Sequence, residues 1–171
     1  MNEYKRILVT GNAGSGKTTL AKKLSDIYKI NQFGLDKIVW SEDWKKTSKE
    51  KRRQLTNKIL SNKLWIIDGV DFGIIEEADQ TIFLDLPRRT CYMRVVKRNY
   101  KYLFKSRPEL PNNCPEINIL PYLIKLIWNF PKDIKPRIIE YGCSKKDGSF
   151  IHIKTQQDLE NYLIDIQDKT R

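Results

Sequence analysis

The sequence predicts an α/β fold in which a doubly wound, five-stranded parallel sheet carries helices on both faces. Three observations favour this class. Short apolar runs alternate with amphipathic helical patterns along the 171 residues. A glycine-rich turn joins the first apolar run to the first helical pattern, and two later runs each end in an aspartate. A chain of this length can bury a core of its own, so we expect a single domain over residues 1–171.

The first half of the chain is expected to run strand, helix, strand, helix. Residues 6–10 form an aliphatic run that suits a buried strand, and residues 17–28 place apolar side chains on one helical face. A short second strand is predicted at residues 30–35, with Asp36 at its carboxyl end. Thr47 and Glu50 match a capping box that opens a basic helix reaching about residue 62, with Leu55 and Ile59 turned inward.

The second half continues the alternation. Residues 64–67 and 81–84 are predicted to be buried strands that end at Asp68 and Asp85. A lid-like helical segment at about residues 89–141 follows. Its expected parts are a helix at 89–105, a proline-rich loop at 106–116, a helix ending near Pro131 and a shorter helix to about Tyr141. A last strand at 149–153 precedes a helix capped by Thr155 and Asp158.

Composition excludes several classes of protein. No stretch approaches the about 18 to 20 apolar residues that a membrane span needs, and the first strand follows the N-terminus without a signal-peptide core. These features favour a cytoplasmic protein with no membrane partner. Cys91, Cys114 and Cys143 are widely spaced without a C-x-x-C pair, so we interpret all three as reduced thiols. His152 is the only histidine, and its apolar neighbours favour a strand position over a catalytic one.

The segment that carries the chemistry is the turn after the first strand. It matches the pattern G-x-x-x-x-G-K-[ST], and the predicted strand before it and helix after it are the context that the pattern requires. Glycines let the main chain wrap closely around phosphate oxygens, and N–H groups at a helix N-terminus attract anions. The sequence therefore predicts an ATP-binding loop, here called the P-loop, whose cofactor-binding residues are Gly11, Asn12, Ala13, Gly14, Ser15, Gly16, Lys17, Thr18 and Thr19.

Within this loop two side chains have distinct predicted roles. Lys17 is expected to reach the β- and γ-phosphates of ATP, and the Thr18 hydroxyl is expected to hold Mg²⁺. Asp68 follows a buried strand and precedes Gly69, which is where such proteins place an acid for the metal or its water shell. Asp85 competes for that role, but the following Leu86 and Pro87 favour a part in starting the next helix.

Basic residues gather on the helix predicted at 89–105. Their spacings of three and four residues place them on one stripe, and no acid interrupts residues 87–107. Because phosphoryl transfer needs positive charge around the moving group, we interpret Arg94 and Arg98 as catalytic residues of a closing lid. A solvated helix face is the alternative, and for Lys97, Lys101 and Lys105 it is the preferred one.

A family resemblance adds to this interpretation. The P-loop, the pair Trp40 and Trp44, the run from Trp65 to Gly69, the pair Arg94 and Arg98, and Arg107-Pro108-Glu109-Leu110 extend over nearly the whole chain. On these residues the sequence resembles P-loop nucleoside-monophosphate kinases. It is most similar to the adenylate-kinase-related family of DNA topology modulation proteins.

The resemblance implies roles for single residues. Asp68 would lie near the metal, Arg94 and Arg98 would meet ATP, and Asp36 would face the phosphate acceptor as a catalytic residue. Arg107 and Arg137 become further candidates for phosphate contacts. One departure stands out: Asp68-Gly69 continues as Val70-Asp71-Phe72, without the Phe-Pro-Arg of adenylate kinases, which argues against AMP as the acceptor.

Two functions remain in view. The first is a kinase that transfers the γ-phosphoryl group of Mg-ATP to a small acceptor that the sequence does not identify. The second is an ATP-binding protein that binds nucleic acid or regulates DNA topology, in keeping with the net charge of +11. The kinase is favoured because no DNA-reading module is recognisable and much of the charge lies on the predicted lid. The oligomeric state stays open.

Overall fold

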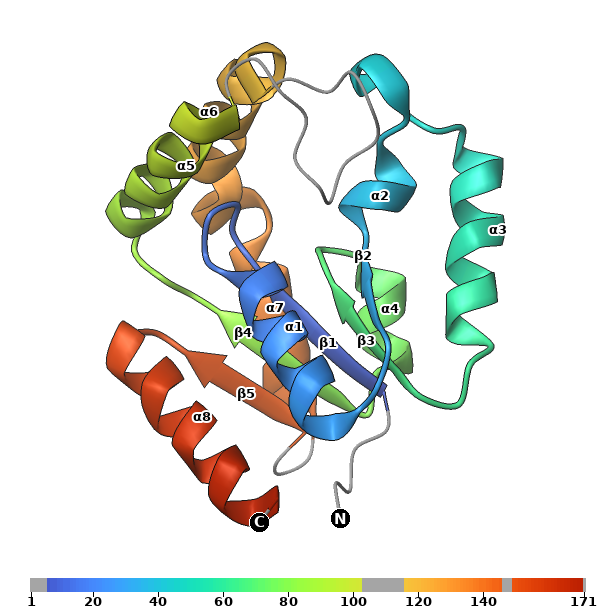
Figure 1. The fold of residues 1–171 in the computed structure, drawn as a ribbon, viewed down its shortest axis with the longest axis vertical. Helices are drawn as coiled ribbons and strands as arrows, with labels where there is room; N and C mark the ends of the chain where they lie inside the picture. Colours follow the sequence, from blue (N-terminus) through green and yellow to red (C-terminus); the bar gives the residue numbers. More distant parts are fainter. Residues whose placement is uncertain (1–5, 103–115, 146–148, 171) are drawn as a thin grey trace.

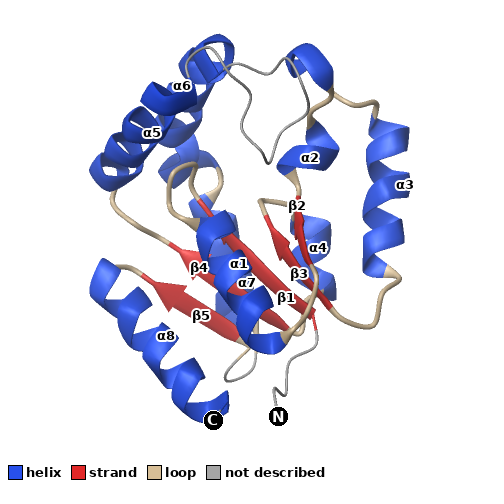
Figure 2. Cartoon of the chain, viewed as in Figure 1, coloured by secondary structure: helices blue, strands red, loops and turns tan. Residues whose placement is uncertain are grey.

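The computed structural model describes residues 6–102, 116–145 and 149–170, and it confirms the predicted fold class. Five parallel strands form one sheet in the order β2-β3-β1-β4-β5 (Figures 1 and 2). The strands are β1 (Arg6–Gly11), β2 (Gln32–Gly34), β3 (Trp65–Asp68), β4 (Gln80–Leu84) and β5 (Phe150–Ile153). Because all strands point the same way, the P-loop, Asp36, Asp68 and Asp85 follow strand ends at one edge of the sheet.

Helices cover both faces of this sheet, as doubly wound folds require. The helices are α1 (Lys17–Tyr28), α2 (Asp36–Val39), α3 (Lys49–Leu60), α4 (Phe72–Glu77), α5 (Arg88–Tyr102), α6 (Glu116–Asp133), α7 (Lys135–Ser144) and α8 (Gln156–Thr170), with a 3₁₀ turn at Glu42–Trp44. Side chains of β1 alternate between the two faces. Ile7 and Val9 pack with residues of α1 and α8, and Leu8 packs with residues of α4 and α7 (Figure 1).

α5 and α6 form an antiparallel pair that stands over the P-loop end of the sheet (Figure 1). We call residues 88–102 and 116–133 the α5–α6 arm. Its own small core contains Cys91 and Val95 of α5 and Ile127 of α6, and Ala13 of the P-loop packs against them. The base of the predicted lid is thus packed onto the P-loop.

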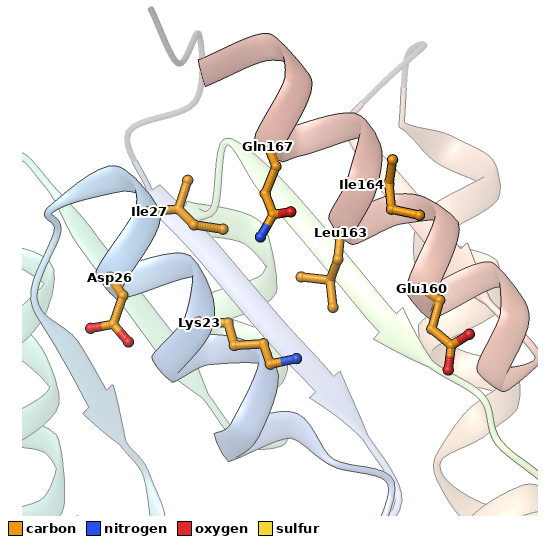
Figure 3. A pocket seen from close by; sticks show the side chains of 7 residues that line it. All are labelled: Lys23, Asp26, Ile27, Glu160, Leu163, Ile164 and Gln167. Carbon is orange, nitrogen blue, oxygen red and sulfur yellow. The ribbon is translucent and has the colours of Figure 1, made fainter. Parts of the chain in front are cut away.

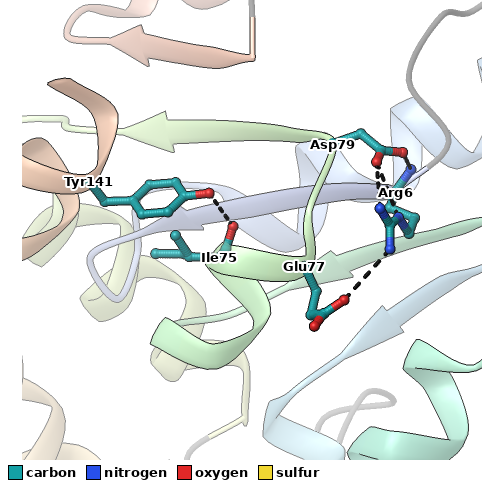
Figure 4. Close-up of polar contacts among 5 residues, drawn as sticks. All are labelled: Arg6, Ile75, Glu77, Asp79 and Tyr141. Atoms are coloured by element: carbon teal, nitrogen blue, oxygen red, sulfur yellow. Dashed lines mark hydrogen bonds and ion pairs between the residues drawn. The ribbon is translucent and has the colours of Figure 1, made fainter. Parts of the chain in front are cut away.

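Polar contacts also fasten the sheet away from this edge. At the start of β1, Arg6 binds Asp79 through Nη2 at 2.9 Å and reaches Glu77 at 3.6 Å (Figure 4). Tyr141 of α7 donates its hydroxyl hydrogen to the Ile75 carbonyl of α4 (Figure 4). Glu77 is 58% exposed, so its ion pair with Arg6 contributes little, and the buried apolar side chains carry most of the stability.

Several predicted details are wrong. The basic helix is capped by Ser48, whose hydroxyl accepts from the Lys51 N–H, instead of by Thr47. Leu55 is exposed, because only Ile59 and Leu60 of α3 reach the core. The helix predicted to end near Pro131 ends at Asp133, so its end is confirmed.

Three further comparisons with the predicted elements concern Asp36, helix α4 and the cap of α8. Asp36 does not close a strand, since β2 ends at Gly34 and Asp36 opens α2. α4 was absent from the predicted order. The cap of α8 is confirmed, because Asp158 N–H donates to the Thr155 hydroxyl and Thr155 N–H donates to Asp158.

Among the cysteines, Cys91 is buried and Cys143 exposed, both as free thiols, while Cys114 lies outside the described residues. His152 lies in β5 as expected. Over the described ranges no helix combines the length and apolarity needed to cross a membrane.

Candidate functional site

The P-loop takes its shape from glycines with positive φ. Gly11, Gly14 and Gly16 have φ values of 145°, 77° and 102°, which side-chain-bearing residues rarely adopt. Two of them also lie against backbone. A Cβ on Gly11 would be 2.4 Å from the Leu84 carbonyl oxygen, and one on Gly14 would be 2.5 Å from that of Cys91. The glycines therefore seat the loop tightly against β4 and α5.

The loop leaves main-chain donors free for an anion. Within the described residues, no protein acceptor binds the N–H groups of Gly14, Gly16, Lys17 or Thr18, and α1 has neither a side-chain cap nor an acid in its first turn. The Ser15 hydroxyl is buried and also lacks a partner there. Orphaned donors at a helix N-terminus fit a polyphosphate, since its oxygens would satisfy all of them.

Lys17 lies among several charges. Its Nζ donates to the Asn12 carbonyl at 2.8 Å. Burial lowers the pKa of Lys17, the nearby carboxylates of Asp36 and Asp68 oppose that shift, and the positive charge of Arg98 adds to it. These effects on the pKa of Lys17 indicate that its ammonium group lies near the carboxylates of Asp36 and Asp68 and near the Arg98 guanidinium.

Asp68 is the acid that meets the P-loop. Its carboxylate accepts a hydrogen bond from the Thr18 hydroxyl at 2.7 Å and another from the Gln32 amide. Asp68 is only 6% exposed, and burial raises its pKa, while those hydrogen bonds and the charge of Lys17 oppose the rise. A carboxylate and a hydroxyl side by side fit Mg²⁺, which binds few protein ligands and completes its shell with water and phosphate oxygens. No group of three His, Cys, Asp or Glu side chains that could hold a metal ion occurs in the described part of the chain.

Asp85, the competing acid, has other partners. Its Oδ2 binds Lys135 of α7 at 2.7 Å and the His152 ring at 2.9 Å. The His152 ring also stacks on Phe83 with centroids 5.0 Å apart. The carboxylate therefore ties α7 and β5 to the end of β4. The interpretation that Asp85 helps to start α5 is not supported by these contacts.

Of the two predicted lid arginines, Arg94 touches the P-loop directly. Its Nη1 donates to the Ser15 carbonyl at 2.9 Å, and its Nη2 donates to the Gln156 side chain at 2.8 Å. Arg94 and Arg98 are both half-buried, while Lys97 between them is exposed. The structure thus separates the arginines, which face the P-loop, from a solvent-facing lysine. Lys105 and Arg107 lie outside the described residues, and so does the side chain of Lys101.

The acceptor-side candidates are less closely joined. Asp36 is exposed at the start of α2, within electrostatic reach of Lys17 and Asp68. The Arg137 guanidinium lies 3.7 Å from the ring centre of Phe72, the first residue of α4, and its side chain is exposed. None of its described contacts is with the P-loop.

Two site residues were missed by sequence reasoning. Gln32 of β2 binds Asp68 of the neighbouring strand β3. The parallel register places Gly34 opposite Asp68, and Gln32, two residues before Gly34, is on the same face of β2. Gln156 binds Arg94, a residue 62 positions away. A polar residue in a short strand and one at a helix start are too common in sequences to stand out, so neither carried a usable signal.

A separate pocket lies between α1 and α8 and holds about 530 Å³ (Figure 3). Apolar side chains of Ile27, Leu163 and Ile164 line it, with charged groups at the rim. None of the predicted site residues lines this pocket, so it is distinct from the phosphate site.

Fold and site together define a P-loop protein of the nucleotide-kinase type. The chain belongs to the AAA domain family AAA_18, whose model matches residues 7–105, more than half of its length. It is also similar to an adenylate kinase of Encephalitozoon cuniculi (strain GB-M1), with 31% identity over 121 residues that cover 57% of this chain and 68% of that one.

Solved structures share the fold. A shikimate kinase from Acinetobacter baumannii in complex with shikimate has a TM-score of 0.60 at 13% identity and covers 99% of this chain and 97% of its own. A deoxyadenosine kinase from M. mycoides with bound dATP has a TM-score of 0.54 at 16% identity and covers 95% and 97%. At these identities the likeness establishes the fold alone. The narrower resemblance to DNA topology modulation proteins stays a prediction.

Proposed function

We propose that this protein transfers the γ-phosphoryl group of Mg-ATP to a small acceptor. The observation that carries the proposal is the set of main-chain N–H groups on Gly14, Gly16, Lys17 and Thr18, which no acceptor among the described residues binds, beside the Lys17 ammonium. Several donors converging on one turn bind several phosphate oxygens at once, which a single lysine does not achieve. The adenylate kinase relative supports a nucleotide as one substrate.

Thr18 and Asp68 would hold the metal. Mg²⁺ would supply positive charge to the β- and γ-phosphates, and the protein side chains would fix where that charge lies. The Thr18 hydroxyl and the Asp68 carboxylate, which lie side by side through their 2.7 Å hydrogen bond, are the two protein groups that would hold the cation. The raised pKa of Asp68 follows from burying its charge beside few compensating groups, and a cation would reverse that effect.

Lys17, Arg94 and Arg98 would stabilise the charge on the transferring group. Lys17, which donates to the Asn12 carbonyl in this structure, would bind phosphate oxygens, and Arg94 already lies against the loop at the Ser15 carbonyl. Phosphoryl transfer involves little covalent work by the protein, so positioned cations account for most of the acceleration.

Asp36 would orient the acceptor hydroxyl or take its proton. Its carboxylate is exposed at the same edge of the sheet and acts electrostatically on both Lys17 and Asp68. An acid at this position would act near the end of the phosphate chain, as transfer to a hydroxyl requires. The absence of an arginine in Val70-Asp71-Phe72 argues against AMP, and the acceptor class stays open.

A panel of nucleosides, nucleotides, sugars and hydroxy acids tests the proposal. ADP release is measured with Mg-ATP alone and with each compound, in the natural protein and in the Asp36→Asn variant. We expect one class of compound to accelerate ADP release, and Asp36→Asn to remove that acceleration while Mg-ATP binding persists. If no compound accelerates ADP release and ATP turnover is absent, the proposal is wrong.

The alternative is an ATP-binding protein that acts on nucleic acid. It is favoured by one feature: in α3, which is described throughout, no side chain is fully buried, and Lys49, Lys51, Arg53 and Lys58 are exposed. A nucleic-acid surface predicts tight binding to duplex DNA with a steep loss of affinity as salt rises. Weak binding beside Mg-dependent ATP turnover leaves the kinase.

A further inference from the structure

Asn12 makes hydrogen bonds through its side-chain oxygen, its side-chain nitrogen and its main-chain carbonyl. Its side-chain Oδ1 accepts the Ala13 N–H at 2.8 Å, and its main-chain carbonyl accepts Ser15 N–H at 3.2 Å and Lys17 Nζ at 2.8 Å. Its Nδ2 donates to the carbonyl of Ile127 in α6 at 3.1 Å, across 115 residues of sequence. The side chain is only 3% exposed. Asn12 is therefore a hub that joins the P-loop, its lysine and the α5–α6 arm.

The carbonyl that Asn12 reaches is free for a specific reason. In an α-helix the carbonyl of residue 127 accepts the N–H of residue 131, and residue 131 is proline, which has no N–H. Ile127 is fully buried, so without Asn12 its carbonyl would be an unsatisfied buried acceptor. Pro131 and Asn12 thus complement each other: the proline removes one donor and the asparagine supplies another.

The arm that this bond holds also carries the candidate catalytic arginines. α6 packs along α5, and Cys91, Val95 and Ile127 share one small core with Ala13 of the P-loop. Arg94 and Arg98 project from that same stretch of α5, and Arg94 meets the Ser15 carbonyl at 2.9 Å. A shift of α6 relative to Asn12 would move these guanidinium groups relative to the phosphate site.

We infer that Asn12 is a positioning residue, whose bond to the carbonyl that Pro131 leaves free holds the α5–α6 arm in register with the P-loop. The inference rests on the proposed kinase function, since register matters to Arg94 and Arg98 as groups that act on the transferring phosphoryl. The N–H groups assigned to the phosphate belong to Gly14, Gly16, Lys17 and Thr18, and none of the hydrogen bonds of the Asn12 side chain is made with them.

The test is a double-mutant cycle in the full-length protein with Asn12→Ala, Pro131→Ala and the double variant. An alanine at 131 restores a helical N–H to Ile127 without altering the P-loop sequence. Loss of one net hydrogen bond predicts that each single variant lowers kcat for ATP turnover by about 5- to 30-fold, with a smaller change in the Kd of Mg-ATP. The effects of the two single variants should not add, because both act on the bond between Asn12 and the Ile127 carbonyl: one removes its donor and the other supplies a competing helical N–H.

Pro121→Ala is the matched control, since Pro121 also lies inside α6 but is exposed and its freed carbonyl is not the one that Asn12 reaches. It should leave kcat unchanged. A Pro131→Ala variant with the kcat of the natural protein, or two single losses that add fully, would overturn the inference. So would coupling between the two sites in urea unfolding without any loss of kcat, because the contact would then be structural only.

Failure of the proposed function gives a different pattern. If the natural protein shows no ATP turnover at all, the kinase proposal is wrong. The double-mutant cycle measured by urea unfolding then tests by itself whether Asn12 holds the α5–α6 arm against the P-loop. Energetic coupling between residues 12 and 131 then supports the contact, and additive unfolding energies overturn it.

Discussion

The Thr18 hydroxyl donates a 2.7 Å hydrogen bond to the carboxylate of Asp68, which joins the first turn of α1 to the end of β3. The two residues are 50 positions apart in the sequence. Their contact brings a hydroxyl and a buried carboxylate to the place where the P-loop opens, and this pair is the basis for the proposed metal site.

The first prediction separates the two acids at the edge of the sheet. Asp68→Asn should abolish Mg-dependent ATP turnover, because it removes the negative charge beside the Thr18 hydroxyl. Asp85→Asn should retain Mg-dependent turnover and lose about 1 to 3 kcal/mol of unfolding free energy, since Lys135 and His152 lose their shared partner. Magnesium titrations and urea unfolding of both variants check this. If Asp85→Asn lost Mg-dependent turnover and Asp68→Asn retained it, the metal would lie at Asp85.

The second prediction concerns the stability of the protein without nucleotide or metal. Burial raises the pKa of Asp68 above its ordinary value, so the folded protein binds this proton more tightly than the unfolded chain does. The stabilisation is complete below the unfolded pKa and is lost as the pH rises through the folded pKa. Asp68→Asn should therefore reduce the loss of unfolding free energy as the pH rises, and it should make the protein more stable than the natural one at neutral pH. Urea unfolding between acidic and neutral pH measures it, and an unchanged slope would show that Asp68 does not titrate in this range.

The third prediction distinguishes the arginines of α5 from the lysine between them. Arg98→Ala and Arg94→Ala should each lower kcat by about 100-fold, the usual cost of removing one group that stabilises transition-state charge. Lys97→Ala is the control, and its exposed side chain should be dispensable. Steady-state ATP turnover of the three variants decides the matter. Equal small losses in all three would support a solvated helix face.

The fourth prediction tests the seating of the P-loop against the arm. Gly14→Ala introduces a Cβ at 2.5 Å from the Cys91 carbonyl oxygen, at a φ of 77°. We expect a loss of more than about 1 kcal/mol in unfolding free energy, because backbone atoms on both sides must move. Gly73→Ala, at an exposed position in α4, should have little effect. Thermal unfolding of both variants measures the difference, and a stable Gly14→Ala protein would contradict the described packing.

Much of the fold was readable from local pattern. The helix predicted at residues 17–28 coincides with α1, and the apolar runs became strands within one or two residues, because buried parallel strands are nearly continuous aliphatic segments. The P-loop was recognisable because its glycines must stand at fixed spacing. Errors arose where neighbouring residues offered equal signals, as with Thr47 and Ser48 at the start of α3.

What the sequence did not reveal depends on contacts between distant segments. The bond of Asn12 to Ile127 and that of Arg94 to Gln156 join residues 115 and 62 positions apart, and each requires the packing of α6 or α8 to be known. The helix was expected to end near Pro131, and α6 ends at Asp133. The sequence did not reveal that the carbonyl of Ile127, which Pro131 leaves without a helical donor, accepts a hydrogen bond from Asn12 of the P-loop.

The central claim is that main-chain amides at the start of α1, together with Lys17, hold the polyphosphate of Mg-ATP. Calorimetric titration of Mg-ATP into the natural protein, Lys17→Ala and Lys22→Ala tests it most directly, since Lys22 is an exposed lysine of the same helix. We expect saturable one-to-one binding of Mg-ATP, which Lys17→Ala weakens strongly and Lys22→Ala leaves intact. Absence of binding to the natural protein, or equal affinity in all three, would contradict it.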